Sequence, residues 1–96
     1  MKLRYTPEAL TELEATLDYI ATHSPHGARR IQQRIMDLTG LLCSHPFAGQ
    51  ATEEPGVRRL FATPYPYALY YQLSPDDVVI VAVRHTARDP ESDAER

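Results

Sequence analysis

Three short runs of residues typical of β-strands lie in the last third of this 96-residue chain, and they constrain its fold more than any other feature. They occupy residues 57–62, 67–73 and 78–85, and the segments Thr-Pro-Tyr-Pro and Ser-Pro-Asp-Asp separate them. Short strands joined by proline-containing turns are typical of an antiparallel meander. In the last run valines alternate with Ile80 and Ala82, so both of its faces are apolar and we expect it inside the sheet.

The first half of the chain carries two helix signals. Thr6-Pro7 and Ser24-Pro25 each place a capping side chain before a proline suited to the first helical position. After each signal, apolar residues recur at steps of three and four, as on the buried side of a helix. These residues are Leu10, Leu13, Leu17 and Ile20 in the first segment and Ala28, Ile31, Ile35, Leu38 and Leu42 in the second. We expect the first helix to end near His23 and the second at His45-Pro46, forming an antiparallel hairpin.

The order of these elements predicts the fold class. Residues 2–6 form a short strand candidate before the first helix, and residues 47–56 read as a loop. The prediction is an α+β fold with the order β-α-α-β-β-β, in which an N-terminal helical hairpin packs on an antiparallel sheet. Residues 1–90 form a single domain, and residues 91–96 are a flexible acidic tail.

The distribution of charge argues against tight nucleic-acid binding. The net charge is −3, but residues 1–88 hold nine Lys and Arg against nine Asp and Glu, so the whole excess lies in residues 89–96. Sequence-independent binding to nucleic acid needs many contacts from Lys and Arg to phosphates, which a neutral body does not offer. The single cysteine, Cys43, excludes an intrachain disulfide, and no apolar stretch is long enough for a membrane span. We therefore expect a cytoplasmic protein without membrane contact.

Metal and cofactor chemistry find no support in the sequence. The histidines of the first half are scattered around helix ends, and Cys43 with His45 is one pair that lacks a second pair of ligands. The four glycines are isolated, so no phosphate-binding loop is present. Cys43 falls on the apolar side of a helix and is better explained as a packed thiol than as a nucleophile. The prediction is no metal and no cofactor.

A basic and aromatic set accompanies the strands of the last third. Its cationic members are Arg58, Arg59, Arg84, His85 and Arg88. A nuclease that uses a 2′-hydroxyl needs a general base and cations for the phosphate, and this set could supply both. The alternative is a histidine at a strand end, with Arg58 and Arg59 on opposite faces of a half-buried sheet. We favour this second interpretation over catalysis.

Six short motifs, in their order and spacing, resemble a known family over nearly the whole chain. They are Tyr5-Thr6-Pro7-Glu8-Ala9, Asp18-Tyr19-Ile20-Ala21, His45-Pro46-Phe47-Ala48-Gly49, Val57-Arg58-Arg59-Leu60, Pro66-Tyr67 with Tyr70-Tyr71, and Val83-Arg84-His85-Thr86-Ala87-Arg88-Asp89. The chain resembles toxins of the RelE/ParE superfamily of type II toxin–antitoxin modules, and more closely those of its ParE branch.

The superfamily contains ribosome-dependent mRNA endonucleases and gyrase poisons on one fold, so the fold alone does not decide the activity. Relative to the ribonuclease branch, a basic residue is replaced by Leu60, two arginines by Ala68 and Thr86, and a tyrosine by Ser92. Only the first basic position of that set, at Arg58, is kept, and Arg88 matches a further basic residue near the end. Gln72 and Ala82 also stand where relatives of the ParE branch often carry arginine. The resemblance implies a toxin that binds DNA gyrase and is not an enzyme; the alternatives are a RelE-like mRNA endonuclease and a degenerate, non-toxic module member.

The resemblance also implies a protein partner, a ParD-like antitoxin. Its candidate contacts are the apolar helix residues Leu10, Leu13, Leu17, Ile31, Ile35 and Leu38. The alternative is that the chain's own sheet consumes that apolar surface. The candidates for contact with the target are Arg58, Arg59, Arg84, His85 and Arg88.

Overall fold

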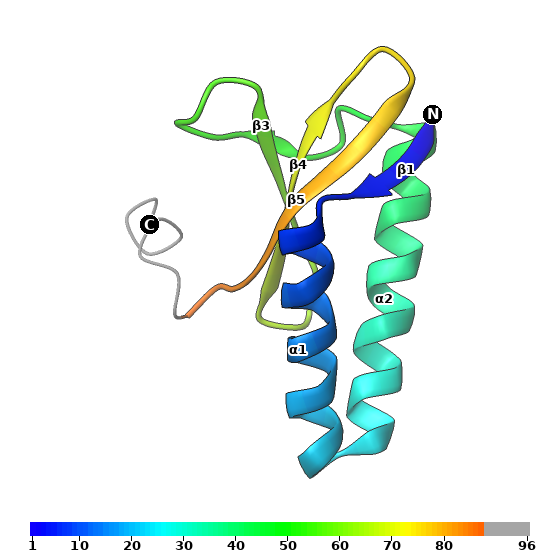
Figure 1. Ribbon diagram of the computed structural model, residues 1–96, viewed down its shortest axis with the longest axis vertical. Helices are drawn as coiled ribbons and strands as arrows, with labels where there is room; N and C mark the ends of the chain where they lie inside the picture. The colour runs from blue at the N-terminus through cyan, green and yellow to red at the C-terminus, as the bar shows by residue number, and fades with distance from the viewer. Residues whose placement is uncertain (88–96) are drawn as a thin grey trace.

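The computed structural model describes residues 1–87, in which a helical hairpin packs against one face of a twisted sheet (Figure 1). Arg88 and the predicted acidic tail lie outside the described residues. The elements follow in the order β1 (Lys2–Tyr5), α1 (Pro7–His23), α2 (Pro25–Ser44), β2 (Gln50–Ala51), β3 (Val57–Phe61), β4 (Tyr67–Leu73) and β5 (Asp77–His85). The predicted α+β fold class is confirmed.

The sheet has the strand order β1-β5-β4-β3-β2. Strands β2 to β5 are antiparallel to their neighbours, as a meander requires, whereas β1 joins β5 in parallel. Parallel neighbours cannot be joined by a tight turn, and here both helices and three strands lie between β1 and β5. Strand β5 is flanked on both sides, in agreement with its apolar faces. The two-residue strand β2 falls in the predicted loop, because so short a segment carries no periodic pattern.

Both helices begin where the capping signals predict. The Thr6 hydroxyl accepts a hydrogen bond from the Ala9 amide at 3.1 Å, and the Ser24 hydroxyl accepts one from the Gly27 amide at 2.9 Å. Each bond satisfies one amide that has no partner within its helix. The helix α2 continues through Gly40 to Ser44, since that glycine is exposed and costs only a fraction of the stability that packing supplies.

The main core lies between the hairpin and the sheet. Ile35 and Leu42 of α2 meet Leu69, Tyr71 and Ile80 of the sheet, and all five side chains are at most 2% exposed. Burying each large apolar side chain contributes about 1.5–3 kcal/mol, so this layer is the main source of stability.

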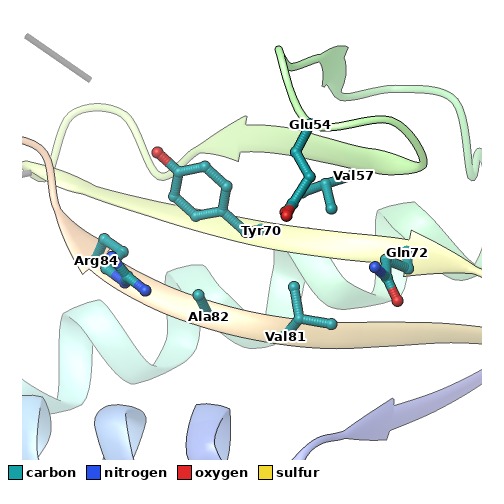
Figure 2. A pocket seen from close by; sticks show the side chains of 7 residues that line it. All are labelled: Glu54, Val57, Tyr70, Gln72, Val81, Ala82 and Arg84. Atoms are coloured by element: carbon teal, nitrogen blue, oxygen red, sulfur yellow. The ribbon is translucent and has the colours of Figure 1, made fainter. Parts of the chain in front are cut away.

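A β-bulge shapes the other face of the sheet. Tyr70 is opposite Ala82 and Tyr71 is opposite Ile80, so Val81 is an extra residue on β5. A bulge interrupts the alternation of side chains, and Val81 and Ala82 consequently both point to the face away from the helices (Figure 2). There they join a second apolar cluster that includes Val57 and Tyr70.

Candidate functional site

A groove opens on the sheet face that the helices leave uncovered (Figure 2). Its main cavity has a volume of about 390 Å³. Its floor residues Val57, Tyr70 and Ala82 are largely buried, and three exposed polar side chains surround the cavity: Glu54 from the loop before β3, Gln72 from β4 and Arg84 from β5. The described residues that line this cavity are Glu54, Val57, Tyr70, Gln72, Val81, Ala82 and Arg84.

A second cavity, of about 310 Å³, adjoins the first around the end of the sheet. Glu54 and Val57 line both cavities, and the second one reaches Phe47 and Arg58. Arg58 is paired with Tyr71 and shares its face, so Phe47 and Arg58 lie on the side of the sheet that packs against the helices, whereas the main cavity lies on the other side. Phe47 is 70% exposed, the largest exposed fraction among the exposed large apolar side chains of the described chain.

The loop that carries Phe47 is held from below by one tyrosine. The buried hydroxyl of Tyr71 donates to the Pro46 carbonyl at 2.8 Å and accepts from the Gly49 amide at 2.9 Å. A side chain at Gly49 has no space, since a Cβ there would lie 2.7 Å from the Arg59 carbonyl oxygen and 2.7 Å from the Tyr71 hydroxyl. These contacts hold the loop in one conformation and therefore fix the position of the exposed Phe47 ring.

Arg58 braces the same loop instead of projecting into solvent. Its Nη2 donates to the Gly49 carbonyl at 2.7 Å and to the Phe47 carbonyl at 3.3 Å, and its guanidinium lies 5.2 Å from the centre of the Phe47 ring. Arg58 is therefore half-buried and its Nη2 is engaged within the chain, which corrects the expectation that it is exposed; its contact with a target stays a prediction.

Arg59 also departs from the expected exposure. Its side chain is on the face opposite to that of Arg58, as the alternation of a strand predicts, but the residue is only 5% exposed. The guanidinium lies 4.8 Å from the centre of the Phe61 ring, a distance typical of a cation–π contact. The prediction that Arg59 is an exposed contact is therefore wrong in this structure.

Among the predicted target contacts within residues 1–87, Arg84 is the one that is exposed and lines the main cavity. Its side chain is 50% exposed, and Nε lies 3.6 Å from Oε2 of Glu12 on α1. The other carboxylate oxygen of Glu12 accepts the Val83 amide at 2.9 Å. Glu12 thus joins α1 to the part of β5 that extends beyond its pairing with β1, and it orients Arg84 at the rim of the groove.

We expect Glu12→Ala to destabilise the protein by about 1.5 kcal/mol, because the Val83 amide loses a charged acceptor. Thermal or urea unfolding measures this effect. Glu12→Gln keeps an oxygen for the amide and should lose about half as much. Glu14→Ala, an exposed change on the same helix, is the control and should stay within about 0.5 kcal/mol of the parent. Equal stabilities of the Glu12→Ala and Glu14→Ala variants would show that the Val83 bond contributes nothing.

His85 lies at the end of β5, outside the described lining of the groove. Its ring meets that of Tyr67 edge to face at 5.2 Å, and its Nδ1 accepts the Ala87 amide at 3.2 Å. Arg88, the last of the predicted target contacts, is outside the described residues. The structure therefore does not gather the basic set into one site.

The predicted antitoxin contacts divide between the two helices. Ile31, Ile35 and Leu38 of α2 are at most 7% exposed, because the sheet consumes that stripe. They are not accessible to a partner, which corrects the prediction for these three. On α1, Leu13 and Leu17 are half-buried against the core and Leu10 is 44% exposed, so this helix keeps an accessible apolar surface.

The positions that distinguish the ribonuclease branch carry no charge here. Leu60 is half-buried and packs against the main core, Ala68 is fully buried, and Thr86 is 9% exposed. Ser92 lies outside the described residues. No cation is available at these three described positions to meet a phosphate.

The part of the chain that the structure describes has few other features that would indicate a metal site, a membrane span or an ionisable active-site group. Among residues 1–87 no three His, Cys, Asp or Glu side chains gather as metal ligands do. Within the same range, no helix combines the length and the apolar character that crossing a membrane requires. Burial raises the pKa of the Tyr5 phenol, but this residue belongs to β1 and does not line the groove.

Phe47, Glu54 and Gln72 were not among the site residues that the sequence predicted. Phe47 carried a signal, since it is the one aromatic residue of the motif His45-Pro46-Phe47-Ala48-Gly49. Glu54 and Gln72 carried none, because an acidic loop residue and a polar strand residue are ordinary at a surface. Only the pairing of β3, β4 and β5 brings them to one groove.

Comparison with known proteins agrees with this architecture. The model of the ParE toxin of the type II toxin–antitoxin system parDE matches residues 3–90. Toxin RelE2 of Caulobacter vibrioides is 34% identical over 88% of this chain and 93% of its own length. Putative toxin Y4kP of Sinorhizobium fredii is 31% identical over 88% of this chain and 86% of its own.

A solved structure of the chromosomal ParDE TA system from P. aeruginosa contains a similar fold, with a TM-score of 0.75 and 26% identity over 88% of this chain and 95% of that one. The extent of the family match and the identity to a known toxin together assign the family. The chain therefore belongs to the ParE toxin family, within the RelE/ParE superfamily of toxins from type II toxin–antitoxin systems.

Proposed function

We propose that this toxin acts by binding DNA gyrase and trapping its complex with cleaved DNA, without catalysing a reaction itself. The observation that carries the proposal is the uncharged character of Leu60, Ala68 and Thr86 in the packed sheet. Cleavage of RNA through a 2′-hydroxyl develops negative charge on the phosphate, and positioned cations are its main source of stabilisation. A toxin that lacks those cations has to act by binding.

The runner-up is a RelE-like mRNA endonuclease, and two residues bear on it. Arg58 keeps a basic position of the ribonuclease branch, but its Nη2 is engaged by the Phe47 and Gly49 carbonyls. His85 is the histidine nearest to the strands of the groove, yet its Nδ1 accepts the Ala87 amide and its ring packs against Tyr67. These contacts support action by binding over a catalytic role for either side chain.

A ParD-like antitoxin is the proposed partner. The similar fold from P. aeruginosa comes from a ParDE system, and α1 offers the accessible apolar residues Leu10, Leu13 and Leu17 for a helix of a partner. An amphipathic helix that binds such a stripe neutralises the toxin through a large buried surface. The toxin would meet both the antitoxin and gyrase in the cytoplasm.

Expression of the toxin without its antitoxin tests the proposal. We expect growth arrest with induction of a DNA-damage reporter, and co-expression of the antitoxin should restore growth. With purified gyrase, the toxin should cause linear DNA to accumulate after protein denaturation, and total RNA should remain intact. Arrest with mRNA cut at ribosomes and no DNA damage would favour the endonuclease. Unimpaired growth with a soluble, folded protein would indicate a non-toxic module member.

A further inference from the structure

The first half of α2 is basic and contains no acidic residue. Residues 24–36 include three arginines and one histidine, without a single Asp or Glu. All four basic residues lie outside the buried stripe that Ile31 and Ile35 form on this helix. We call them the basic strip: His26, Arg29, Arg30 and Arg34. The strip extends about 12 Å along the helix axis, at the end of the hairpin where α1 and α2 join (Figure 1).

Neutral acceptors hold two guanidinium groups of the basic strip. Nη2 of Arg29 lies 2.9 Å from Nδ1 of His26, and this ring nitrogen is the acceptor because arginine can only donate. Nε of Arg34 donates to the Thr63 carbonyl at 2.9 Å, in the turn between β3 and β4. A carbonyl and a neutral ring nitrogen orient these two cations but do not neutralise their charge.

The charge of the basic strip is not compensated by the described part of the chain. Within residues 1–87, no carboxylate forms an ion pair with any of its three arginines. Arg4, in contrast, pairs with Asp77 at 3.2 Å. Asp37 follows the strip on α2, but its Oδ1 accepts a hydrogen bond from Nε2 of Gln33 at 2.9 Å. An anion from outside the described chain would therefore find these guanidinium groups unneutralised.

A shallow cavity of about 480 Å³ lies beside the basic strip, between α2 and the turn that joins β3 to β4. Arg30 and Arg34 line it from successive turns of the helix, and Thr63 and Tyr65 line it from the other side. The planar guanidinium group of arginine can donate two parallel hydrogen bonds to the oxygens of one phosphate. Two arginines beside one cavity therefore suit a phosphate group.

The polar character of the basic strip favours nucleic acid over a protein as its ligand. No large apolar side chain is exposed between residues 24 and 35. The centre of a protein–protein interface is apolar and poor in charge, whereas a protein–DNA interface is polar and strongly positive. The N-terminus of α2 adds partial positive charge, since its first turn contains no acidic residue to offset the helix dipole.

We propose that the basic strip contacts the phosphate backbone of the DNA that gyrase holds, so that the toxin touches both components of the trapped complex. This inference rests on the proposed function in taking that complex to be gyrase with cleaved DNA. Residues 1–88 carry no net charge, so the toxin alone should bind DNA weakly. The contact matters where gyrase already holds DNA beside the strip, and it carries no base preference.

A double variant tests the basic strip. Arg29→Gln with Arg30→Gln removes two positive charges at exposed positions of α2. Lys2→Gln with Arg4→Gln is the matched control, because it removes two positive charges at exposed positions of β1. Each protein is compared for thermal unfolding, antitoxin affinity, affinity for gyrase without DNA, and the amount of cleaved complex trapped. Binding of a short fluorescent DNA duplex to the toxin alone is measured at several salt concentrations.

We expect the double variant to bind the duplex about tenfold more weakly than the parent at low salt, whatever the DNA sequence. Each lost phosphate contact lowers the slope of log affinity against log salt by about 0.9, so the slope should fall by about 2. About tenfold more of this variant should be needed to trap the same amount of cleaved complex. Melting temperature, antitoxin affinity and affinity for gyrase without DNA should stay close to those of the parent. The control should match the parent in DNA binding.

A charge-keeping variant separates the effect of charge from any effect on folding. Arg30→Lys retains a cation at an exposed position, so it should keep most of the affinity for the duplex and most of the salt slope. If Arg30→Lys weakened DNA binding as much as Arg30→Gln does, the loss would not be due to the charge, and the inference would be overturned.

The other outcomes separate this inference from the proposed function. Equal DNA affinity and equal salt slopes in the parent and the double variant would overturn the basic strip while leaving gyrase as the target. Loss of affinity for the antitoxin or for gyrase without DNA, with DNA binding intact, would make a protein the ligand. Tighter binding of an RNA duplex of the same length would make RNA the ligand. A parent that binds DNA through the strip but leaves gyrase unaffected would overturn the proposed function alone.

Discussion

Gly49→Ala should lower the free energy of unfolding by about 3 kcal/mol, as expected when a side chain is forced into a packed site. The new Cβ would lie 2.7 Å from the Arg59 carbonyl oxygen and 2.8 Å from Cε1 of Tyr71. The first neighbour is backbone of β3 and the second is a fully buried ring, so neither gives way easily. Urea unfolding monitored by circular dichroism measures the change.

Gly40→Ala is the matched control for this substitution. Gly40 lies in α2 with open space around the position of a Cβ, and alanine favours the helix over glycine by about 0.5–1 kcal/mol. The same chemical change should therefore stabilise the protein at Gly40 and destabilise it at Gly49. Equal effects at the two positions would contradict the close packing of the Phe47 loop.

Tyr71→Phe should lower the free energy of unfolding by about 3 kcal/mol, although it removes a single oxygen atom. The Tyr71 hydroxyl is the donor to the Pro46 carbonyl and the acceptor for the Gly49 amide, and its residue is fully buried. Leaving a buried donor or acceptor without a partner costs about 1–3 kcal/mol for each group. Chemical unfolding gives the stability change, and amide hydrogen exchange at Gly49 reports directly on the lost bond.

The control for this prediction is Tyr19→Phe on α1, where the residue is 57% exposed. Its hydroxyl meets solvent, so the free energy of unfolding should change by no more than about 0.5 kcal/mol. If Tyr71→Phe left both stability and exchange at Gly49 unchanged, the hydroxyl would not be what holds the loop.

The fold followed closely from local patterns in the sequence. Thr6-Pro7 and Ser24-Pro25 predicted the starts of both helices, since capping and proline act within one turn. Residues 67–73 were predicted as a strand with the bounds observed for β4, because proline-containing turns frame them. The parallel pairing of β1 and the short strand β2 were not predicted, since both depend on partners distant in the chain.

The candidate site was predicted less well. The cluster of basic residues indicated a shared surface, but the structure buries Arg59, engages Arg58 in bracing a loop and leaves Arg84 exposed at the groove. The position of these residues in the sequence does not specify their roles. Side chains alternate between the two faces of a strand, so neighbouring residues make different contacts. Likewise, only the packing in the structure shows that apolar residues of α1 are accessible whereas those of α2 are buried.

The sequence by itself determined the order of the elements except β2, the amphipathic hairpin and the absence of charge at Leu60, Ala68 and Thr86, since these are properties of residue type and short-range spacing. Only the tertiary structure decided that Val81 is an extra residue on β5, that Tyr71 holds the Phe47 loop, and that a cavity forms beside Tyr70 and Ala82. These features depend on strand register and on contacts between residues more than ten positions apart. Such contacts are set by the packing of the whole sheet, and no local pattern encodes them.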